Sequence, residues 1–132
     1  MSDSSDIEHQ GVLKKRRSGW MKNMDSVWYP RYFILKKDLT IQYYDDDRPP
    51  KEGSIVRKST SLVGSKVTFM EPFDGAPNSF TITIMPAGAN AEKWRMTTES
   101  KLELDNWMAA FDRLNVVINM HDSNLNYRSM SP

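Results

Sequence analysis

The pattern of apolar and polar positions is clearest near the end of the chain, over residues 100–120 (SKLELDNWMAAFDRLNVVINM). Five apolar side chains recur there at helical spacing and share one stripe: Leu104, Trp107, Met108, Phe111 and Leu114. Ser100 followed by Glu103 has the spacing of a capping box, which begins a helix. The segment therefore predicts one amphipathic helix, whose apolar stripe must cover an apolar surface formed by the rest of the chain.

The residues before this helix read as short strands with period-two alternation. In the cleanest of them Phe80, Ile82 and Ile84 face one way, and two threonines face the other. Seven strands are predicted, at residues 11–16, 28–36, 39–44, 54–57, 66–70, 79–85 and 92–97. Such closely spaced strands followed by one helix predict a mainly β (α+β) fold, an antiparallel barrel or sandwich with the helix over one opening or face.

Length and composition indicate a single soluble domain. The chain has 132 residues, of which 39% are hydrophobic and 27% charged, and this is enough for one core. We expect a disordered N-terminal tail over residues 1–9, one domain over residues 10–120, and a C-terminal tail over residues 121–132. The absence of cysteine excludes disulfides and thiol chemistry, and it fits a cytoplasmic location.

Charge and hydropathy limit the partners. The net charge of +1 does not predict a nucleic-acid partner, so any electrostatic function must come from local patches. The polar, acidic N-terminus has no signal-peptide core, and no apolar run reaches the ~18 residues that a membrane helix needs. Contact with a membrane is therefore expected only by recruitment to its surface.

Several motifs, taken in order, resemble the pleckstrin homology (PH) domain family. Residues 11–15 (GVLKK) are similar to its first strand, and residues 28–35 (WYPRYFIL) to its W-x-x-R-x-F-x-L second strand. Residues 41–44 (IQYY) resemble the third strand, and Trp107 matches the tryptophan of the family's helix. The resemblance covers residues 8–120. It implies seven strands in two nearly orthogonal sheets closed by the C-terminal helix. Phosphotyrosine-binding, Ran-binding and EVH1 domains share this fold and are the alternative assignment.

A cluster of basic residues lies between the first two predicted strands. Lys14, Lys15, Arg16, Arg17 and Lys22 fall within nine residues, and no acidic residue interrupts them. Several ammonium and guanidinium groups on one hairpin loop can surround a polyanion such as a phosphorylated headgroup. The alternative is a solvated loop whose charges keep a sheet edge soluble.

The resemblance implies a phosphoinositide headgroup site. Phosphoinositide-binding members use a lysine on the first strand, which Lys15 matches, and two basic residues on the second, of which Arg31 matches the last. The middle position is Tyr29, which brings no charge. Tyr44 falls near a third-strand tyrosine that touches phosphate in several members. The acidic residues 45–47 depart from the pattern, and we expect partial compensation from the basic residues 57–58.

Trp20 and Met21 lie in the middle of the basic loop. One interpretation is a wedge that inserts into the lipid interface, where tryptophan is favoured. The other is that Trp20 folds back onto the barrel as part of the core. Trp28, Trp94 and Trp107 lie within periodic elements and are expected in the core.

Nothing in the sequence predicts an enzyme, a metal site or a cofactor. Both histidines, His9 and His121, fall in the expected tails, where catalytic geometry cannot be held. The acidic residues 45–47 lack the glycine of a calcium loop and are followed by two prolines. Two hypotheses remain: a membrane-targeting module that binds phosphoinositides, and a protein-interaction or scaffold module of the same fold with little or no lipid binding.

Overall fold

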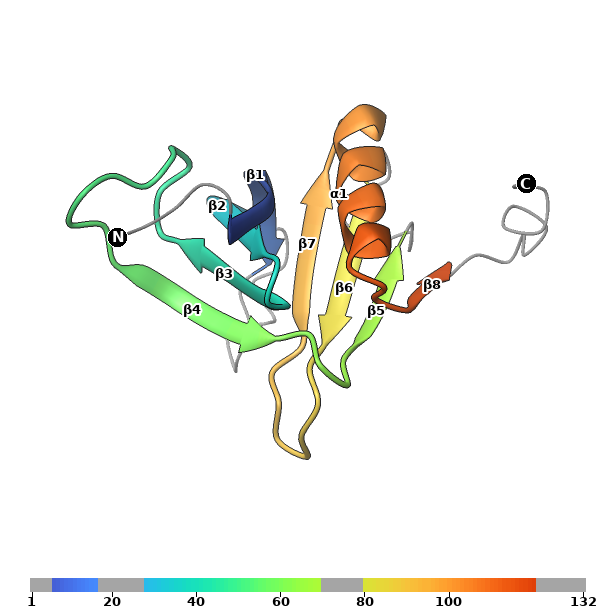
Figure 1. The fold of residues 1–132 in the computed structure, drawn as a ribbon. Helices are drawn as coiled ribbons and strands as arrows, with labels where there is room; N and C mark the ends of the chain where they lie inside the picture. The colour runs from blue at the N-terminus through green and yellow to red at the C-terminus, as the bar shows by residue number, and fades with distance from the viewer. Residues whose placement is uncertain (1–5, 17–27, 70–79, 121–132) are drawn as a thin grey trace.

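The computed structural model describes residues 6–16, 28–69 and 80–120 (Figure 1). These residues form eight strands and one α-helix: β1 (Ile7–Arg16), β2 (Trp28–Lys36), β3 (Thr40–Tyr44), β4 (Val56–Ser61), β5 (Lys66–Phe69), β6 (Phe80–Met85), β7 (Trp94–Thr98), α1 (Lys101–Arg113) and β8 (Ile118–Met120). The predicted fold class is confirmed, because the domain is rich in strands and has one helix near its C-terminal end. The structure adds an eighth strand after that helix, β8, which the sequence did not predict. No helix in the described ranges is long and apolar enough to cross a membrane.

The strands hydrogen-bond in the order β4-β3-β2-β1-β7-β6-β5-β8. All neighbours are antiparallel except β5 and β8, which are parallel. β1 pairs with β2 along its whole length but with β7 only at Lys14 and Lys15. The sheet bends at this joint, so β2–β4 run across the direction of β5–β7 (Figure 1).

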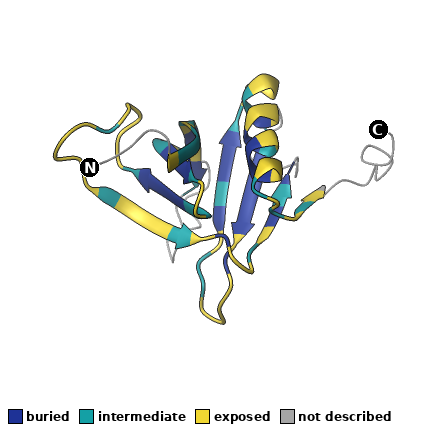
Figure 2. Cartoon of the chain, viewed as in Figure 1, coloured by how far each residue is buried: buried dark blue, intermediate teal, exposed yellow. Residues whose placement is uncertain are grey.

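The core fills the space between the two halves of the sheet and α1. Strands β1–β3 and β5–β7 all contribute buried apolar side chains, whereas β4 contributes none and is largely exposed (Figure 2). The helix adds Leu104, Trp107, Ala110 and Phe111, which confirms the predicted stripe, although Met108 and Leu114 are only partly buried. Trp94 is buried as expected. Trp28 is only partly buried, because it begins β2 at the end of the sheet.

The start of α1 forms half of the predicted capping box. The Ser100 hydroxyl accepts a hydrogen bond from the Glu103 N–H at 3.0 Å. The Glu103 side chain does not return to the Ser100 N–H, which instead donates to the Thr98 hydroxyl at 3.1 Å. The Glu103 carboxylate lies 3.2 Å from His9 Nε2 and therefore joins the helix to β1.

The helix ends earlier than the sequence pattern predicts. It was expected to reach residue 120 but ends at Arg113, because Asn115 adopts a left-handed backbone with φ of 63°. The Val116 N–H then closes the end by donating to the Phe111 carbonyl at 3.0 Å. The apolar residues that follow form β8, whose residue Ile118 lies opposite Val67 of β5.

The ends of two further strands also differ from expectation. β1 begins at Ile7, so residues 7–9 of the expected N-terminal tail are strand, and His9 pairs with Leu35 instead of lying in a tail. This start depends on pairing with β2, which the polar segment itself does not reveal. β4 begins at Val56, two residues later than predicted, because the Ser54 N–H closes a turn on the Lys51 carbonyl at 2.9 Å.

Candidate anion-binding site

Strand alternation gathers polar side chains at one open end of the concave face. Lys15 follows Leu13 on the inner side of β1, and the register places it opposite Tyr29 of β2. Arg31 shares that side of β2, since it lies opposite Leu13. In β3 the inner residue is Tyr43, which pairs with Lys58 of β4. Three basic residues from three strands therefore share one face beyond the apolar core.

These side chains line a pocket with a volume of about 350 Å³. The pocket contains five basic residues, two tyrosines and one acidic residue: Lys15, Arg16, Arg31, Arg57, Lys58, Tyr29, Tyr43 and Glu92. We call this the basic pocket. Because positive charge dominates its lining, it is suited to an anion with several acceptor oxygens.

Lys15 lies deepest among the cationic groups of the basic pocket. Only 6% of it is exposed, and burial lowers the pKa of its ammonium group, partly opposed by the negative charge of Glu92. Its Nζ donates to the Arg16 carbonyl at 3.2 Å and lies 5.6 Å and 6.0 Å from the ring centres of Tyr43 and Trp94. An ammonium group has three N–H donors, so this lysine can still donate to a ligand.

Tyr43 keeps its proton at neutral pH. Burial raises the pKa of its phenol, and the nearby Lys58 opposes this effect only in part. The ring also packs against Phe33 and Trp94, with centroid distances of 5.0 Å and 5.1 Å. Tyr43 is therefore a rigid wall of the basic pocket with an O–H that can donate a hydrogen bond.

The guanidinium group of Arg31 is held by a ring and by an acid. It lies 5.0 Å from the centre of the Tyr29 ring, a cation–π distance. Its Nη1 donates to the Asp45 carbonyl at 3.2 Å, and its Nε lies 3.5 Å from Asp45 Oδ1. Arg31 therefore already has an ion-pair partner within the domain, Asp45.

Acidic side chains also hold two other basic groups. Arg57 Nη1 donates to Asp45 Oδ2 at 3.0 Å. Lys58 Nζ lies 2.5 Å from Glu92 Oε1. Both contacts are partly exposed, so an anion from solution competes for them in water.

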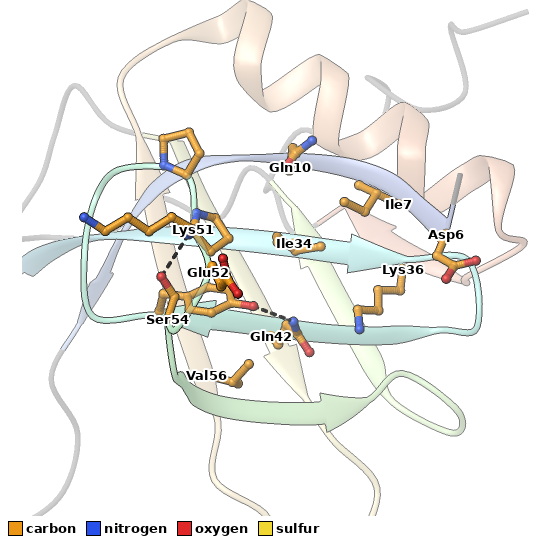
Figure 3. A pocket seen from close by; sticks show the side chains of 13 residues that line it. Asp6, Ile7, Gln10, Ile34, Lys36, Gln42, Lys51, Glu52, Ser54 and Val56 are labelled. Atoms are coloured by element: carbon orange, nitrogen blue, oxygen red, sulfur yellow. Dashed lines mark hydrogen bonds between the residues drawn. The ribbon is translucent and has the colours of Figure 1, made fainter. Parts of the chain in front are cut away.

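Of the residues predicted to bind the headgroup, the structure brings Lys15, Arg16 and Arg31 together but not Tyr44. The Tyr44 hydroxyl accepts a hydrogen bond from Gln42 Nε2 at 3.1 Å, and both side chains line a separate groove on the outer face of β2 and β3 (Figure 3). Strand alternation explains this, since consecutive residues point to opposite faces. Arg17 and Lys22, together with Trp20 and Met21, lie outside the described residues.

Five residues of the basic pocket were not among the site residues predicted from the sequence: Tyr29, Tyr43, Arg57, Lys58 and Glu92. Leu39, Ile41 and Tyr43 alternate with more polar residues in the sequence, which was a usable signal that Tyr43 faces inward. Residues 57–58 were expected only to compensate for the acidic residues 45–47. Glu92 gave no signal, because it precedes β7 and reaches the pocket only through the fold.

Two of the acidic residues 45–47 form ion pairs with arginines. In the part of the chain that is described, no group of three or more histidine or acidic side chains is placed to hold a metal ion. Asp45 pairs with two arginines, and Asp46 accepts from Arg48 Nη2 at 3.2 Å. Asp45 and Asp46 therefore act as partners of basic side chains.

The sequence is similar to parts of longer proteins. It is 28% identical over 109 residues to Rho GTPase-activating protein 22 of Mus musculus, covering 74% of this chain and 15% of that protein. It is 25% identical over 122 residues to Rho GTPase-activating protein 24 of Rattus norvegicus, covering 85% of this chain and 16% of that protein. The chain thus spans about a sixth of the length of these curated relatives.

Solved structures share the fold. The PH domain of human KIAA0053 protein has a TM-score of 0.63 at 22% identity, covering 94% of this chain and 99% of that one. The C-terminal PH domain of pleckstrin has a TM-score of 0.55 at 25% identity, covering 82% of this chain and 96% of that one. A sequence model of the PH domain matches residues 7–114, which is most of the chain. The chain therefore belongs to the pleckstrin homology domain family.

Proposed function

We propose that this domain binds the phosphorylated inositol headgroup of a phosphoinositide in the basic pocket, and that this binding recruits it from the cytoplasm to a membrane surface. The observation that carries the proposal is the convergence of five basic side chains on one pocket whose lining has a single acidic residue. A ligand with several phosphate groups matches this arrangement, because each phosphate accepts charge-assisted hydrogen bonds from more than one donor.

The side chains have distinct roles in this proposal. Arg31 offers a planar fork that can hold one phosphate through two hydrogen bonds, and the Tyr29 ring limits its motion. Lys15 supplies a compact charge at the base of the pocket, beside the neutral O–H of Tyr43. Hydrogen bonds to charged groups are worth ~1.5–3 kcal/mol each, so a few such contacts supply the ~8 kcal/mol of micromolar binding.

Inositol phosphate complexes of structurally similar domains support the proposal. The C-terminal PH domain of pleckstrin has been solved with D-myo-Ins(1,2,3,4,5)P5, at 23% identity and a TM-score of 0.54 to this chain. The Slm1-PH domain has been solved with inositol-4-phosphate, at 17% identity and a TM-score of 0.55. These ligands belong to those proteins, and they make inositol phosphates the first ligands to test here.

The second candidate function is protein interaction. It is favoured by the acidic side chains at the basic pocket, since Asp45 and Glu92 already pair with Arg31, Arg57 and Lys58. A fold whose basic groups are satisfied internally needs no phosphate ligand. This reading predicts a domain that is stable but has no measurable affinity for inositol phosphates or for vesicles that contain phosphoinositides.

Calorimetric titration with soluble inositol phosphates, together with co-sedimentation with vesicles of different phosphoinositides, tests the proposal. Arg31→Ala should weaken headgroup binding by ~1.5–3 kcal/mol, because it removes a charged donor pair. Arg57→Ala should have a smaller effect. Arg48→Ala is the matched control, since its side chain is 80% exposed and lies outside the basic pocket. Equal binding by the wild type and Arg31→Ala would rule out the basic pocket as the headgroup site. Binding by neither would favour the scaffold function.

A further inference from the structure

Asp45 connects two arginines of the basic pocket through its two carboxylate oxygens. Oδ1 lies 3.5 Å from Arg31 Nε, and Oδ2 accepts from Arg57 Nη1 at 3.0 Å. The two arginines come from different strands, β2 and β4, and Asp45 follows β3, which lies between them. An anionic group thus already occupies the position between the two guanidinium groups.

A carboxylate in this position resembles a bound phosphate. Both groups present oxygen acceptors to guanidinium donors, and arginine recognises both with the same planar geometry. Asp45 is nevertheless replaceable, because its side chain is 60% exposed and an exposed ion pair is weak in water. A phosphate brings more charge and a third acceptor oxygen, so it can displace the carboxylate from the arginines.

We infer that Asp45 is an internal competitor for the headgroup: its carboxylate holds Arg31 and Arg57 in the unliganded domain and must leave them when a ligand phosphate binds. This inference rests on the proposed function and adds a residue that sets its affinity. The competition makes binding weaker than the basic side chains alone would give. The opposite role is positioning, in which Asp45 holds the arginines ready for the ligand and stays in place.

Asp45→Asn separates the two roles, because it removes the carboxylate charge and keeps the size of the side chain. A competitor predicts tighter binding, by about threefold to tenfold, since the ligand no longer has to break two ion pairs or approach a like charge. A positioning residue predicts weaker binding. Asp46→Asn is the matched control: it makes the same change in net charge, but Asp46 pairs with Arg48 outside the basic pocket. Its effect should be less than about twofold.

The affinities are measured in two arms, by calorimetry with a soluble inositol polyphosphate and by co-sedimentation with phosphoinositide vesicles. A gain for Asp45→Asn in both arms supports competition at the headgroup. The competitor role would be overturned if Asp45→Asn bound more tightly only to vesicles, and gained as much on phosphatidylserine vesicles that lack phosphoinositide. That result would indicate a general effect of surface charge. Equal gains for Asp45→Asn and Asp46→Asn would overturn the competitor role for the same reason.

Arg31→Ala tests whether the gain in affinity from Asp45→Asn arises at the basic pocket. It also distinguishes a failure of the competitor role from a failure of the proposed function. In an Arg31→Ala background, Asp45→Asn should give a smaller gain, because one of the two competing contacts is already absent. If the wild type binds and Arg31→Ala weakens binding, while Asp45→Asn gives no gain, only the competitor role fails. If neither the wild type nor Asp45→Asn binds in either arm, the proposed function itself fails.

Discussion

The imidazole of His9 packs edge-on against the indole of Trp107, with ring centroids 4.5 Å apart and planes at 88°. The same imidazole approaches the Glu103 carboxylate at 3.2 Å. The start of β1 is thereby joined to α1, although the two segments are more than ninety residues apart in the chain. Because Trp107 is fully buried, this contact fixes the helix over the core.

Trp107→Ala should lower the free energy of unfolding by ~3–5 kcal/mol, the range for deleting a large buried aromatic side chain. The loss removes the contact with His9 and a second ring contact with Phe111 at 6.2 Å. Urea unfolding followed by circular dichroism measures the change. Leu102→Ala is the control on the same helix, since Leu102 is 70% exposed. A loss for Trp107→Ala no larger than that for the control would contradict the packing described above.

Asn115→Gly and Asn115→Ala test how α1 ends. With φ of 63°, Asn115 occupies a region that glycine adopts freely and alanine does not. We expect Asn115→Gly to be neutral or slightly stabilising, and Asn115→Ala to cost about 1 kcal/mol. Thermal unfolding of the two variants beside the wild type provides the comparison. If alanine were tolerated as well as glycine, the helix would not depend on this residue for its end.

Lys15→Met should change how stability depends on pH. In the folded protein, burial lowers the pKa of Lys15 below its ordinary value of 10.5, which applies to the unfolded chain. At a pH between the folded and the unfolded pKa, the unfolded chain therefore binds more protons than the folded one. The stability contributed by this position in the wild type therefore rises with pH across that window. Lys15→Met has no ionisable side chain at this position and therefore lacks this pH dependence. We expect Lys15→Met to be at least as stable as the wild type at pH 7.5, and to lose part of that advantage at pH 10.

Guanidinium unfolding at pH 7.5 and pH 10 measures this difference between the two proteins. Tyr32 and Tyr43 contribute with the opposite sign, because burial raises the pKa of each phenol, but they are present in both proteins and largely cancel. Lys66→Met, on the exposed side of β5, is the control for replacing a lysine with methionine in a strand. A constant difference between Lys15→Met and the wild type at the two pH values would show that burial does not perturb this lysine.

The proposed membrane contact of Trp20 and Met21 has a fluorescence test. On anionic vesicles, the emission of the wild type should shift to the blue, because an indole at residue 20 would leave water for the lipid interface. Trp20→Phe should abolish the shift, since Trp94 and Trp107 are already buried. Trp28→Phe, which replaces the partly buried tryptophan at the start of β2, should keep it. An unchanged spectrum for the wild type, or an equal shift for Trp20→Phe, would argue against insertion at this loop.

The sequence predicted the helix and strands whose formation depends on the local pattern of apolar and polar residues. It did not predict the ends of elements that depend on backbone conformation or on contacts with distant parts of the chain. Alternation in β6 and the helical stripe around Trp107 were sufficient for the fold class. The end of α1 was missed because Val116 and Ile118 continue an apolar pattern past Asn115, whose backbone conformation does not show in hydropathy. The start of β1 was missed because residues 7–10 are mostly polar, and only pairing with β2 makes them a strand.

Local sequence patterns likewise predicted only part of the candidate site. Lys15 and Arg31 could be placed on one face from the alternation of β1 and β2, because their register follows from a simple antiparallel pair. Tyr44 was expected beside them, but its neighbour Tyr43 faces the basic pocket. Glu92 could not be predicted, since its contact with Lys58 joins residues thirty-four positions apart.

The position of β4 at one end of the sheet has a consequence for self-association. A strand at a sheet edge presents unpaired backbone groups, and charged side chains on it discourage a second molecule from adding a strand. β4 is exposed over most of its length, and it carries Arg57 and Lys58. The charges that line the basic pocket also protect this edge from aggregation. Substitutions there should therefore be checked for oligomers before any change in binding is assigned to the pocket.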